Sequence, residues 1–311
     1  MSIVLPIKPG HTWENSLVKL YHNNNSVCSQ KVRVTLAEKQ LPWESMHLDL
    51  SKGEQYEPDY LQLNPEGVVP TLIDDGLVLR ESGVIAEYLD QLSATNPLAP
   101  AEPKAAAAMH LWLVRTIDIH AAINSVSFAT LMRQKQLQDS TPEEVEARIA
   151  KFPNPQIRTK RLDLYRNGVK SPYVAGALFT LMRMFEDMAR TLETSDWLTD
   201  GQYGLSDIAL IAYVDRLDRL GLDGLWSERY PKIETWLRAS QARPSYQTAI
   251  GSLIPQQLAQ QTRQAGQAAW PEIREIWNSI PKYGTVNHTN AGFWLFFLVT
   301  GCATLSFAPF F

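Results

Sequence analysis

The sequence predicts an α/β domain over residues 16–97 and an all-helical domain over residues 102–262. The first prediction rests on short apolar runs rich in β-branched residues, separated by turn residues and by one helical run. The second rests on long amphipathic runs with helical spacing in the remainder of the chain. A length of 311 residues and a hydrophobic content of 45% suit two domains that share a sizeable core.

The elements of the first domain follow a recognisable order. Apolar runs predict strands over residues 17–21, 43–48, 71–73 and 77–79. Asp74-Asp75-Gly76 forms a tight hairpin turn between the last two strands. One helix opens after the first strand and ends near Lys39, and another starts at Arg80. The predicted order is therefore βαβ followed by ββα.

Ser26 and Cys28 lie where the first helix begins. The first turn of a helix has unpaired N–H groups and carries roughly +0.5 of an elementary charge, so a thiolate held there is stabilised relative to the thiol. The run Asn-Ser-Val-Cys-Ser-Gln-Lys-Val-Arg over residues 25–33 is thus a candidate thiol site. The simpler alternatives are that Ser26 is a plain N-cap and Cys28 a small buried residue.

Two further motifs come later in this domain. Pro70 directly precedes a predicted strand and follows Val69, a pattern typical of a cis peptide that presents the preceding backbone to a peptide-like ligand. An edge-strand proline is the alternative. Glu81 and Ser82 start the next helix, where backbone N–H groups and a hydroxyl could hold a carboxylate. Ordinary helix capping would also explain this pair.

Together, these motifs and their order resemble the thioredoxin-like domain of the glutathione S-transferases. The resemblance covers residues 16–92 and continues into the helical half. It implies that glutathione is the cosubstrate, that Val69 and Pro70 bind its cysteinyl backbone, and that Glu81 and Ser82 bind its γ-glutamyl end. It also implies a homodimer and a small hydrophobic or aromatic second substrate.

Within that family, Ser26-Val27-Cys28-Ser29 is most similar to the Ser-x-Cys-Ser of zeta-class enzymes and tetrachlorohydroquinone reductive dehalogenases. This implies that Ser26 activates the glutathione thiol and that Cys28 is an accessory or redox cysteine. Residues 97–100 and 151–161 instead resemble bacterial β-aryl etherases, which use glutathione to open aryl ethers. We therefore expect a glutathione-dependent transferase whose reaction is conjugation, reductive dehalogenation, isomerisation or aryl-ether cleavage.

The helical domain opens with a long helix predicted over residues 104–127. Trp112, Arg115, Thr116 and Ile119 recur along one face at i, i+3, i+4 and i+7. We predict that Trp112 and Arg115 border the pocket for the second substrate, although this face could equally be a core stripe with one salt bridge. Further helices are predicted over residues 174–193, 207–220 and 231–241.

The run Tyr203-Gly204-Leu205-Ser206-Asp207 resembles the capping box that starts a buried helix of the family. Gly204 stands where Ser or Thr is usual, an exchange that costs only about a few tenths of a kcal/mol. We expect this departure to affect folding detail more than function.

Between these helices, residues 130–173 form a polar insertion. Nine Lys and Arg against five Asp and Glu give it a balance of +4, in a chain whose net charge is −4. It could neutralise an acidic substrate or meet an anionic surface, or it could be a solvated loop and helix. Without interleaved aromatic residues, and with a sequence pI near 5.9, nucleic acid is not expected as a partner.

The chain has two cysteines, Cys28 and Cys302, which excludes a disulfide framework and favours a reducing compartment, so a cytoplasmic location is expected. The six histidines fall at no metal-ligand spacing, and no metal site is expected. His110 and His120 are interpreted as ordinary helix residues.

The C-terminal end is unusual. Residues 263–291 are expected to be an extension, and residues 292–311 carry no charge. Twenty helical residues match a hydrocarbon core of roughly 30 Å, so this tail is a possible membrane anchor, although Gly301 and Pro309 would equally suit packing in a groove or dimer interface. The alternative function is a membrane-tethered protein with little or no catalysis, resembling the ganglioside-induced differentiation-associated proteins.

Overall fold

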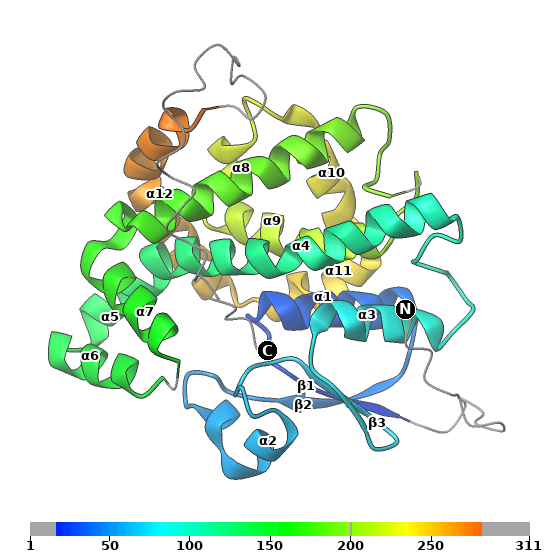
Figure 1. Ribbon diagram of the computed structural model, residues 1–311, viewed down its shortest axis with the longest axis horizontal. Helices are drawn as coiled ribbons and strands as arrows, with labels where there is room; N and C mark the ends of the chain where they lie inside the picture. Colours follow the sequence, from blue (N-terminus) through cyan, green and yellow to red (C-terminus); the bar gives the residue numbers. More distant parts are fainter. Residues whose placement is uncertain (1–16, 153, 200, 282–311) are drawn as a thin grey trace, which may run out of the picture.

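The computed structural model describes residues 17–152, 154–199 and 201–281 (Figure 1). Its first domain is built on a four-stranded sheet with the strand order β2-β1-β3-β4. β1 pairs in parallel with β2, and β3 pairs antiparallel with both β1 and β4. These strands confirm the predicted βαβ and ββα units, and they span Val18–His22 (β1), Trp43–His47 (β2), Thr71–Asp74 (β3) and Leu77–Leu79 (β4).

Two helices cover the sheet face that looks toward the helical domain (Figure 1). They are α1 (Val27–Glu38) and α3 (Ser82–Gln91), while the short α2 (Pro58–Leu63) lies apart from both. The core between sheet and helices is made by apolar side chains that alternate along the strands and recur on one side of each helix. It contains Val18, Leu20, Val32, Leu36, Leu72, Ile85 and Leu89.

The second domain is all-helical among the described residues, apart from one isolated bridge. Most of its helices begin with proline at the first helical position, where the missing N–H costs nothing and the fixed φ favours the helix. The long central pair is formed by α4 and α8, and α9 is buried beneath them. The helices span Pro103–Ser127 (α4), Arg133–Asp139 (α5), Pro142–Ala150 (α6), Pro155–Asn167 (α7), Pro172–Leu192 (α8), Leu205–Arg219 (α9), Pro231–Gln241 (α10), Pro244–Ala249 (α11) and Gln256–Ser279 (α12).

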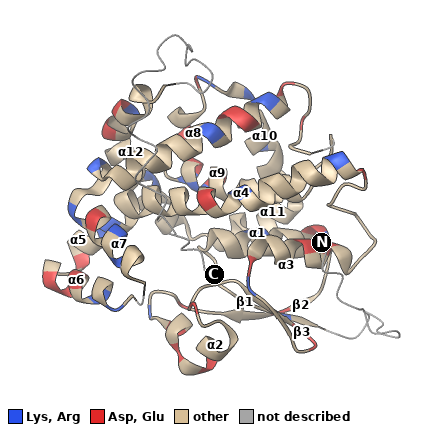
Figure 2. Cartoon of the chain, viewed as in Figure 1, with Lys and Arg blue, Asp and Glu red and all other residues tan. Residues whose placement is uncertain are grey.

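The polar insertion is helical. After α4 a π-helical turn (Phe128–Met132) redirects the chain, and α5, α6 and α7 follow within residues 130–173. Figure 2 shows both signs of charge on α6 and α7. Part of the basic excess is paired inside the insertion, because Arg166 of α7 forms an ion pair with Glu146 of α6.

The expected boundary between residues 262 and 263 falls inside α12, which is continuous through that point. Thr262, Ala265, Ile273 and Trp277 continue one buried face along this helix, so it packs as a single unit. The expected anchor over residues 292–311 lies outside the described residues. Among the residues that are described, no helix has the length and apolar character needed to cross a membrane.

Gly204 has a steric reason for its place before α9. The N–H of Leu205 donates to the carbonyl oxygen of Leu98 at 3.1 Å, which brings that oxygen against the N-cap. A Cβ on Gly204 would lie 2.5 Å from the same oxygen. Asp207 supplies the other half of the cap, since its carboxylate accepts from the Gly204 N–H at 3.1 Å and from the indole N–H of Trp236 at 2.7 Å. Glycine is therefore required here, not merely tolerated.

We expect Gly204→Ala to lower the free energy of unfolding by about 1–3 kcal/mol, as overpacking against a fixed carbonyl does. The control is Gly176→Ala on the exposed side of α8, where a Cβ meets nothing within 4 Å. That change should leave stability unchanged or raise it by up to about 1 kcal/mol. Urea unfolding of both variants measures the difference, and equal stability of the two would contradict the steric explanation.

Candidate active site

Ser26 is the N-cap of α1. Its backbone is extended, with φ −72° and ψ 116°, and its hydroxyl oxygen accepts from the Ser29 N–H at 3.3 Å. A serine hydroxyl has one hydrogen to donate and two lone pairs. Because the cap uses only a lone pair, the hydrogen stays available for an anion at the positive end of the helix. The capping role and the thiol-activating role predicted for Ser26 are thus compatible.

The loop before Ser26 is fixed by buried donors. Arg33 of α1 donates to the carbonyl oxygens of Asn23 at 3.1 Å and Asn24 at 3.2 Å. Arg216 of α9 donates to the Asn25 carbonyl oxygen at 2.5 Å. The carbonyl groups of three successive residues are therefore held in place, and the donor to the third comes from the helical domain. These hydrogen bonds fix the position of Ser26.

Cys28 is the second residue of α1 and is only partly exposed. Its Sγ lies 3.5 Å from Nδ1 of His120 on α4, and the Ser82 side chain also hydrogen-bonds to it. Burial raises the pKa of the Cys28 thiol, but Lys31, His120 and Ser82 outweigh burial and lower that pKa to about 6. The first turns of α1 and α3 therefore meet at this sulfur.

Lys31 follows Cys28 by one turn of α1 and is buried, with 3% exposure. Its Nζ donates to the Tyr213 hydroxyl of α9 at 2.9 Å, and Nζ lies 4.9 Å from the centre of that ring. The Tyr213 hydroxyl in turn donates to the Thr116 carbonyl oxygen on α4 at 3.4 Å. Burial lowers the pKa of Lys31, while the negative charges of Cys28 and Glu81 oppose that effect.

The Val69-Pro70 peptide bond is cis, as the sequence pattern predicts. The loop before it is held from α2, because the Tyr60 hydroxyl donates to the Val68 carbonyl at 2.5 Å and Asn64 donates to the same oxygen at 2.8 Å. Gly67 has φ +61°, and a Cβ there would lie 2.7 Å from the Tyr56 ring. The backbone that should meet glutathione is thus fixed from one side by packing and hydrogen bonds.

Glu81 and Ser82 take different positions at the start of α3. Glu81 is the N-cap and is exposed, whereas Ser82 is the first helical residue and is 7% exposed. Ser82 lies against Cys28 of α1, so the structure joins two of the predicted site motifs. Glu81 acts on the same cluster through its charge, which raises the pKa of Lys31.

Trp112 and Arg115 have contacts elsewhere. Trp112 is buried in the helical core, and the Arg115 guanidinium stacks 4.7 Å from the centre of its ring. Arg115 also forms an ion pair with Asp187 of α8. Its charge therefore has a partner, which it shares with Arg190, as in the core-stripe alternative, and a role for Trp112 and Arg115 in substrate binding stays a prediction.

His120 is a site residue that the sequence analysis missed. It lies on α4, 92 residues from Cys28 in sequence, and no local motif marks it. Helical spacing gives the only retrospective signal, because Thr116, His120 and Asn124 repeat at i, i+4 and i+8 beside the stripe already noted. His110 is an exposed helix residue that pairs with Glu87 of α3 at 2.6 Å.

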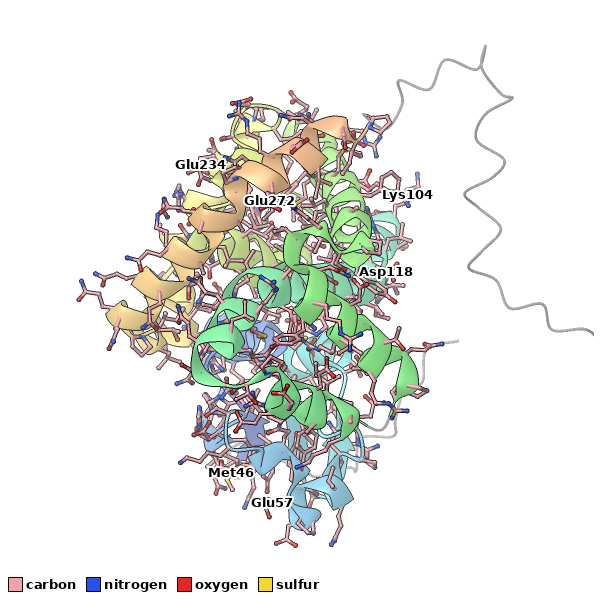
Figure 3. The ribbon with its side chains drawn as sticks, turned by 90° about the vertical axis from the view of Figure 1, so that its left-hand side faces the viewer. Met46, Glu57, Lys104, Asp118, Glu234 and Glu272 are labelled. Atoms are coloured by element: carbon pink, nitrogen blue, oxygen red, sulfur yellow. The ribbon has the colours of Figure 1, made fainter. Side chains whose placement is uncertain are left out.

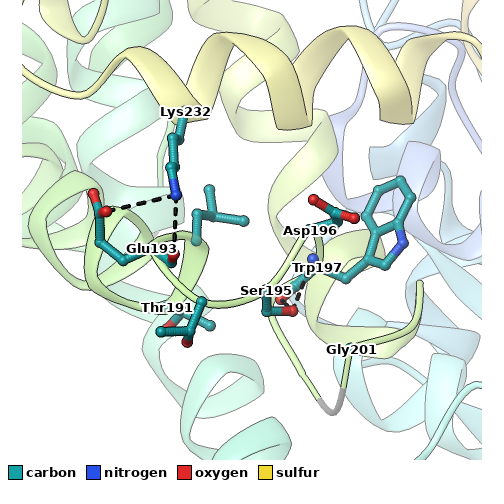
Figure 4. A pocket seen from close by; sticks show the side chains of 9 residues that line it. Thr191, Glu193, Ser195, Asp196, Trp197, Gly201 and Lys232 are labelled. Carbon is teal, nitrogen blue, oxygen red and sulfur yellow. Dashed lines mark hydrogen bonds and ion pairs between the residues drawn. The ribbon is translucent and has the colours of Figure 1, made fainter.

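One pocket lies away from these residues. It has a volume of about 740 Å³ and lies between the end of α8 and α10 (Figure 4). Its polar groups satisfy one another, since Lys232 donates to the Glu193 carbonyl at 2.9 Å and Ser195 bonds to Trp197. In the described residues, no group of three or more His, Cys, Asp or Glu side chains could hold a metal ion.

Two family models match the chain. The family model of the glutathione S-transferase N-terminal domain matches residues 16–91, and that of the C-terminal domain matches residues 172–239. The two matches fall on the first domain and on part of the helical half.

Individual relatives are similar over most of their length. Protein LigF of Sphingobium sp. is 32% identical over 238 residues, which are 73% of this chain and 91% of LigF. The tetrachloro-p-hydroquinone reductive dehalogenase of Sphingobium chlorophenolicum is 25% identical over 239 residues, covering 75% of this chain and 95% of the dehalogenase. The crystal structure of the β-etherase LigF superposes with a TM-score of 0.63 at 31% identity, over 75% of this chain and 98% of LigF.

The comparisons give no support for a membrane-tethered protein. The chain belongs to the glutathione S-transferase family and is an enzyme of that type, with glutathione as its cosubstrate.

Proposed function

We propose that this transferase opens aryl ethers with glutathione. The observation that carries the proposal is the Ser26 hydroxyl, whose hydrogen is free at the α1 N-terminus, in a chain similar to LigF over 91% of that protein. The Ser26 O–H donates to the glutathione sulfur and lowers the pKa of its thiol, so more of it is thiolate at neutral pH.

The reaction is a displacement at the ether carbon. The glutathione thiolate attacks that carbon, a C–S bond forms, and the C–O bond breaks with its electron pair leaving on the aryloxide. The aryloxide then takes up a proton, and no redox change occurs. The positive end of α1 stabilises the thiolate before the attack. Like conjugation, and unlike reductive dehalogenation, this reaction needs Ser26 but not Cys28.

Reductive dehalogenation is the second candidate, and the Cys28 contacts favour it. Cys28 touches His120 at 3.5 Å and has a pKa of about 6, so it is largely ionised at neutral pH. A thiolate there can attack the sulfur of an aryl–glutathione conjugate, forming a mixed disulfide and leaving a reduced arene after protonation. A second glutathione releases Cys28 as glutathione disulfide forms. This candidate is also supported by similarity to the reductive dehalogenase, which the match covers over 95% of its length.

We also propose that the enzyme is a homodimer. Leu111, Val114 and Ile117 of α4 are 65%, 66% and 67% exposed and recur on one face of the helix. Figure 3 shows Lys104 and Asp118 of the same helix along one side of the molecule. Val84 of α3, 50% exposed, adds the first domain to this surface, because Glu87 and His110 pair across the two helices. Exposed apolar surfaces of this kind mark interaction sites.

The glutathione assignment predicts a binding defect. Glu81→Ala combined with Ser82→Ala should weaken glutathione binding more than tenfold, since hydrogen bonds to charged groups contribute about 1.5–3 kcal/mol each. Calorimetry measures the dissociation constant. Glu102→Ala is the matched control, because Glu102 is also an exposed N-cap glutamate, at α4. An unchanged constant in the double variant would sink the assignment.

Substitutions of Ser26 and Cys28 should affect different sets of substrates. Ser26→Ala should lower turnover about 100-fold with every electrophile, as loss of a donor to a developing or held anion does. Cys28→Ser should lose reductive activity but keep ether cleavage. Thr141→Ala controls for capping, because it removes the N-cap of α6 away from the site. Equal loss of both activities in Cys28→Ser would contradict the separation.

The dimer surface can be tested by size-exclusion chromatography with light scattering. Val114→Glu should give a monomer, because a charge in an apolar interface is costly to desolvate. Leu137→Glu on α5 provides the control, since Leu137 is 51% exposed but lies on a different helix. If Val114→Glu keeps the mass of wild type, or if wild type is itself a monomer, this surface is not a dimer interface.

A further inference from the structure

Four elements surround the Cys28 sulfur. Lys31 acts on it from α1, Ser82 from α3, His120 from α4 and Tyr213 from α9, while Glu81 at the start of α3 acts on Lys31 and Tyr213. His120 Nδ1 lies 3.5 Å from the sulfur, and the Ser82 and Tyr213 side chains also interact with it. Two of these three groups belong to the helical domain, so the surroundings of Cys28 are completed only by the second domain.

The proton of His120 can be placed from its other neighbour. Asn124 Nδ2 lies 2.9 Å from His120 Nε2, one turn along α4. In this orientation of the Asn124 amide its nitrogen donates, so Nε2 accepts and Nδ1 carries the proton of the neutral ring. Nδ1–H then points at Cys28 from 3.5 Å, and the sulfur is the acceptor. Thiolate sulfur is a far better acceptor than thiol sulfur.

Tyr213 is a second donor to the same sulfur. Burial raises the pKa of Tyr213 well above its usual range, with the Cys28 charge adding to that effect, so the phenol keeps its proton. Its oxygen accepts from Lys31 Nζ at 2.9 Å, and its one O–H is shared between the Thr116 carbonyl oxygen, 3.4 Å away, and the Cys28 sulfur. An oxygen that accepts from an ammonium group donates more strongly.

Lys31 supplies the positive charge. A buried ammonium group needs a counter-charge or it loses its proton. In the described part of the chain no carboxylate forms an ion pair with Lys31, whose hydrogen-bond partner is the neutral Tyr213. Glu81 acts on it only from the exposed end of the cluster. Cys28, one helical turn away on α1, is the buried group that can supply the negative charge.

We propose that His120, Tyr213 and Lys31 hold Cys28 as a thiolate, so that docking of the helical domain on α1 creates a second sulfur nucleophile beside the glutathione site. His120 and Tyr213 are positioning residues that act through Cys28. The inference rests on the proposed function for the place of glutathione, but the thiolate itself requires no substrate. The thiolate can therefore be tested independently of ether cleavage.

This nucleophile should react with glutathione disulfide. The Cys28 thiolate attacks one sulfur of the disulfide, a new S–S bond forms, the old one breaks, and glutathione thiolate leaves. One disulfide is exchanged for another, so no further oxidant or reductant is needed. The product is Cys28 in a mixed disulfide with glutathione.

The test is the pH profile of Cys28 alkylation by iodoacetamide. All variants carry Cys302→Ser, so that Cys28 is the one cysteine left in the chain. The rate should rise with pH and level off above a midpoint near pH 6, because the thiolate is the form that reacts. His120→Leu removes the Nδ1 donor and should move the midpoint upward by at least about one pH unit, toward the ordinary value of about 8.5.

Two variants guard against a merely structural effect. His120→Asn places an amide N–H near the position of Nδ1 and should keep the low midpoint. Tyr213→Phe removes only a hydroxyl and should raise the midpoint without loss of packing. His110→Leu is the matched control, because His110 lies on the same helix about 15 Å away along the axis. Mass spectrometry measures how much glutathione Cys28 takes up from glutathione disulfide. Variants with a raised midpoint should take up less than those that keep the low midpoint.

A wild-type midpoint near the ordinary thiol value, or one that neither His120→Leu nor Tyr213→Phe moves, would overturn the proposal. Ether cleavage measured in the same variants separates the two hypotheses. If the midpoint is ordinary while Ser26-dependent cleavage persists, only this inference fails. If the midpoint is low while no ether is cleaved, the proposed function fails and the thiolate remains.

Discussion

Burial of the polar helix α1 between two domains is the constraint on which the rest of the structure depends. Its side chains Gln30, Lys31, Arg33, Thr35 and Glu38 are all buried, although helices of this composition usually leave one side in water. Burying such groups costs several kcal/mol each unless they find partners. The sheet and α3 offer mainly apolar surface, so the partners must come from the helical domain and from the loop before α1.

The partners are specific, and they fix how the domains meet. Arg33 donates to the Ala249 carbonyl oxygen at 3.0 Å, and Glu38 accepts from Arg243 at 2.7 Å. These contacts form where α1 meets the segment around α11. Removing one partner would leave a buried charge unpaired, so sliding of the domains is strongly opposed. His120 is thereby held opposite Cys28 although neither residue contributes to the docking charge pairs.

Local signals explain what could be predicted from the sequence. The strands, the α1 start, the cis bond at Pro70 and the cap at Asp207 each depend on residues a few positions apart. Ser82 was assigned to glutathione but also touches Cys28, a contact that requires the packing of α3 on α1. His120 and Tyr213 depend on the register of α4 and α9 against α1, which no spacing encodes. The reason for Gly204 likewise requires the distant Leu98 carbonyl.

Two thiolates at one helix start would repel each other. The residues around Cys28 can offset this repulsion. A negative glutathione sulfur held by Ser26 would raise the pKa of Cys28, two residues further along α1, by like-charge interaction. The positive end of α1 supplies only roughly half an elementary charge. Lys31 adds a full charge from inside, and His120 and Tyr213 add donors that the glutathione sulfur does not share. If Cys28 is a thiolate as proposed, the interface would allow both sulfurs to remain nucleophilic together, which the helix end alone would not.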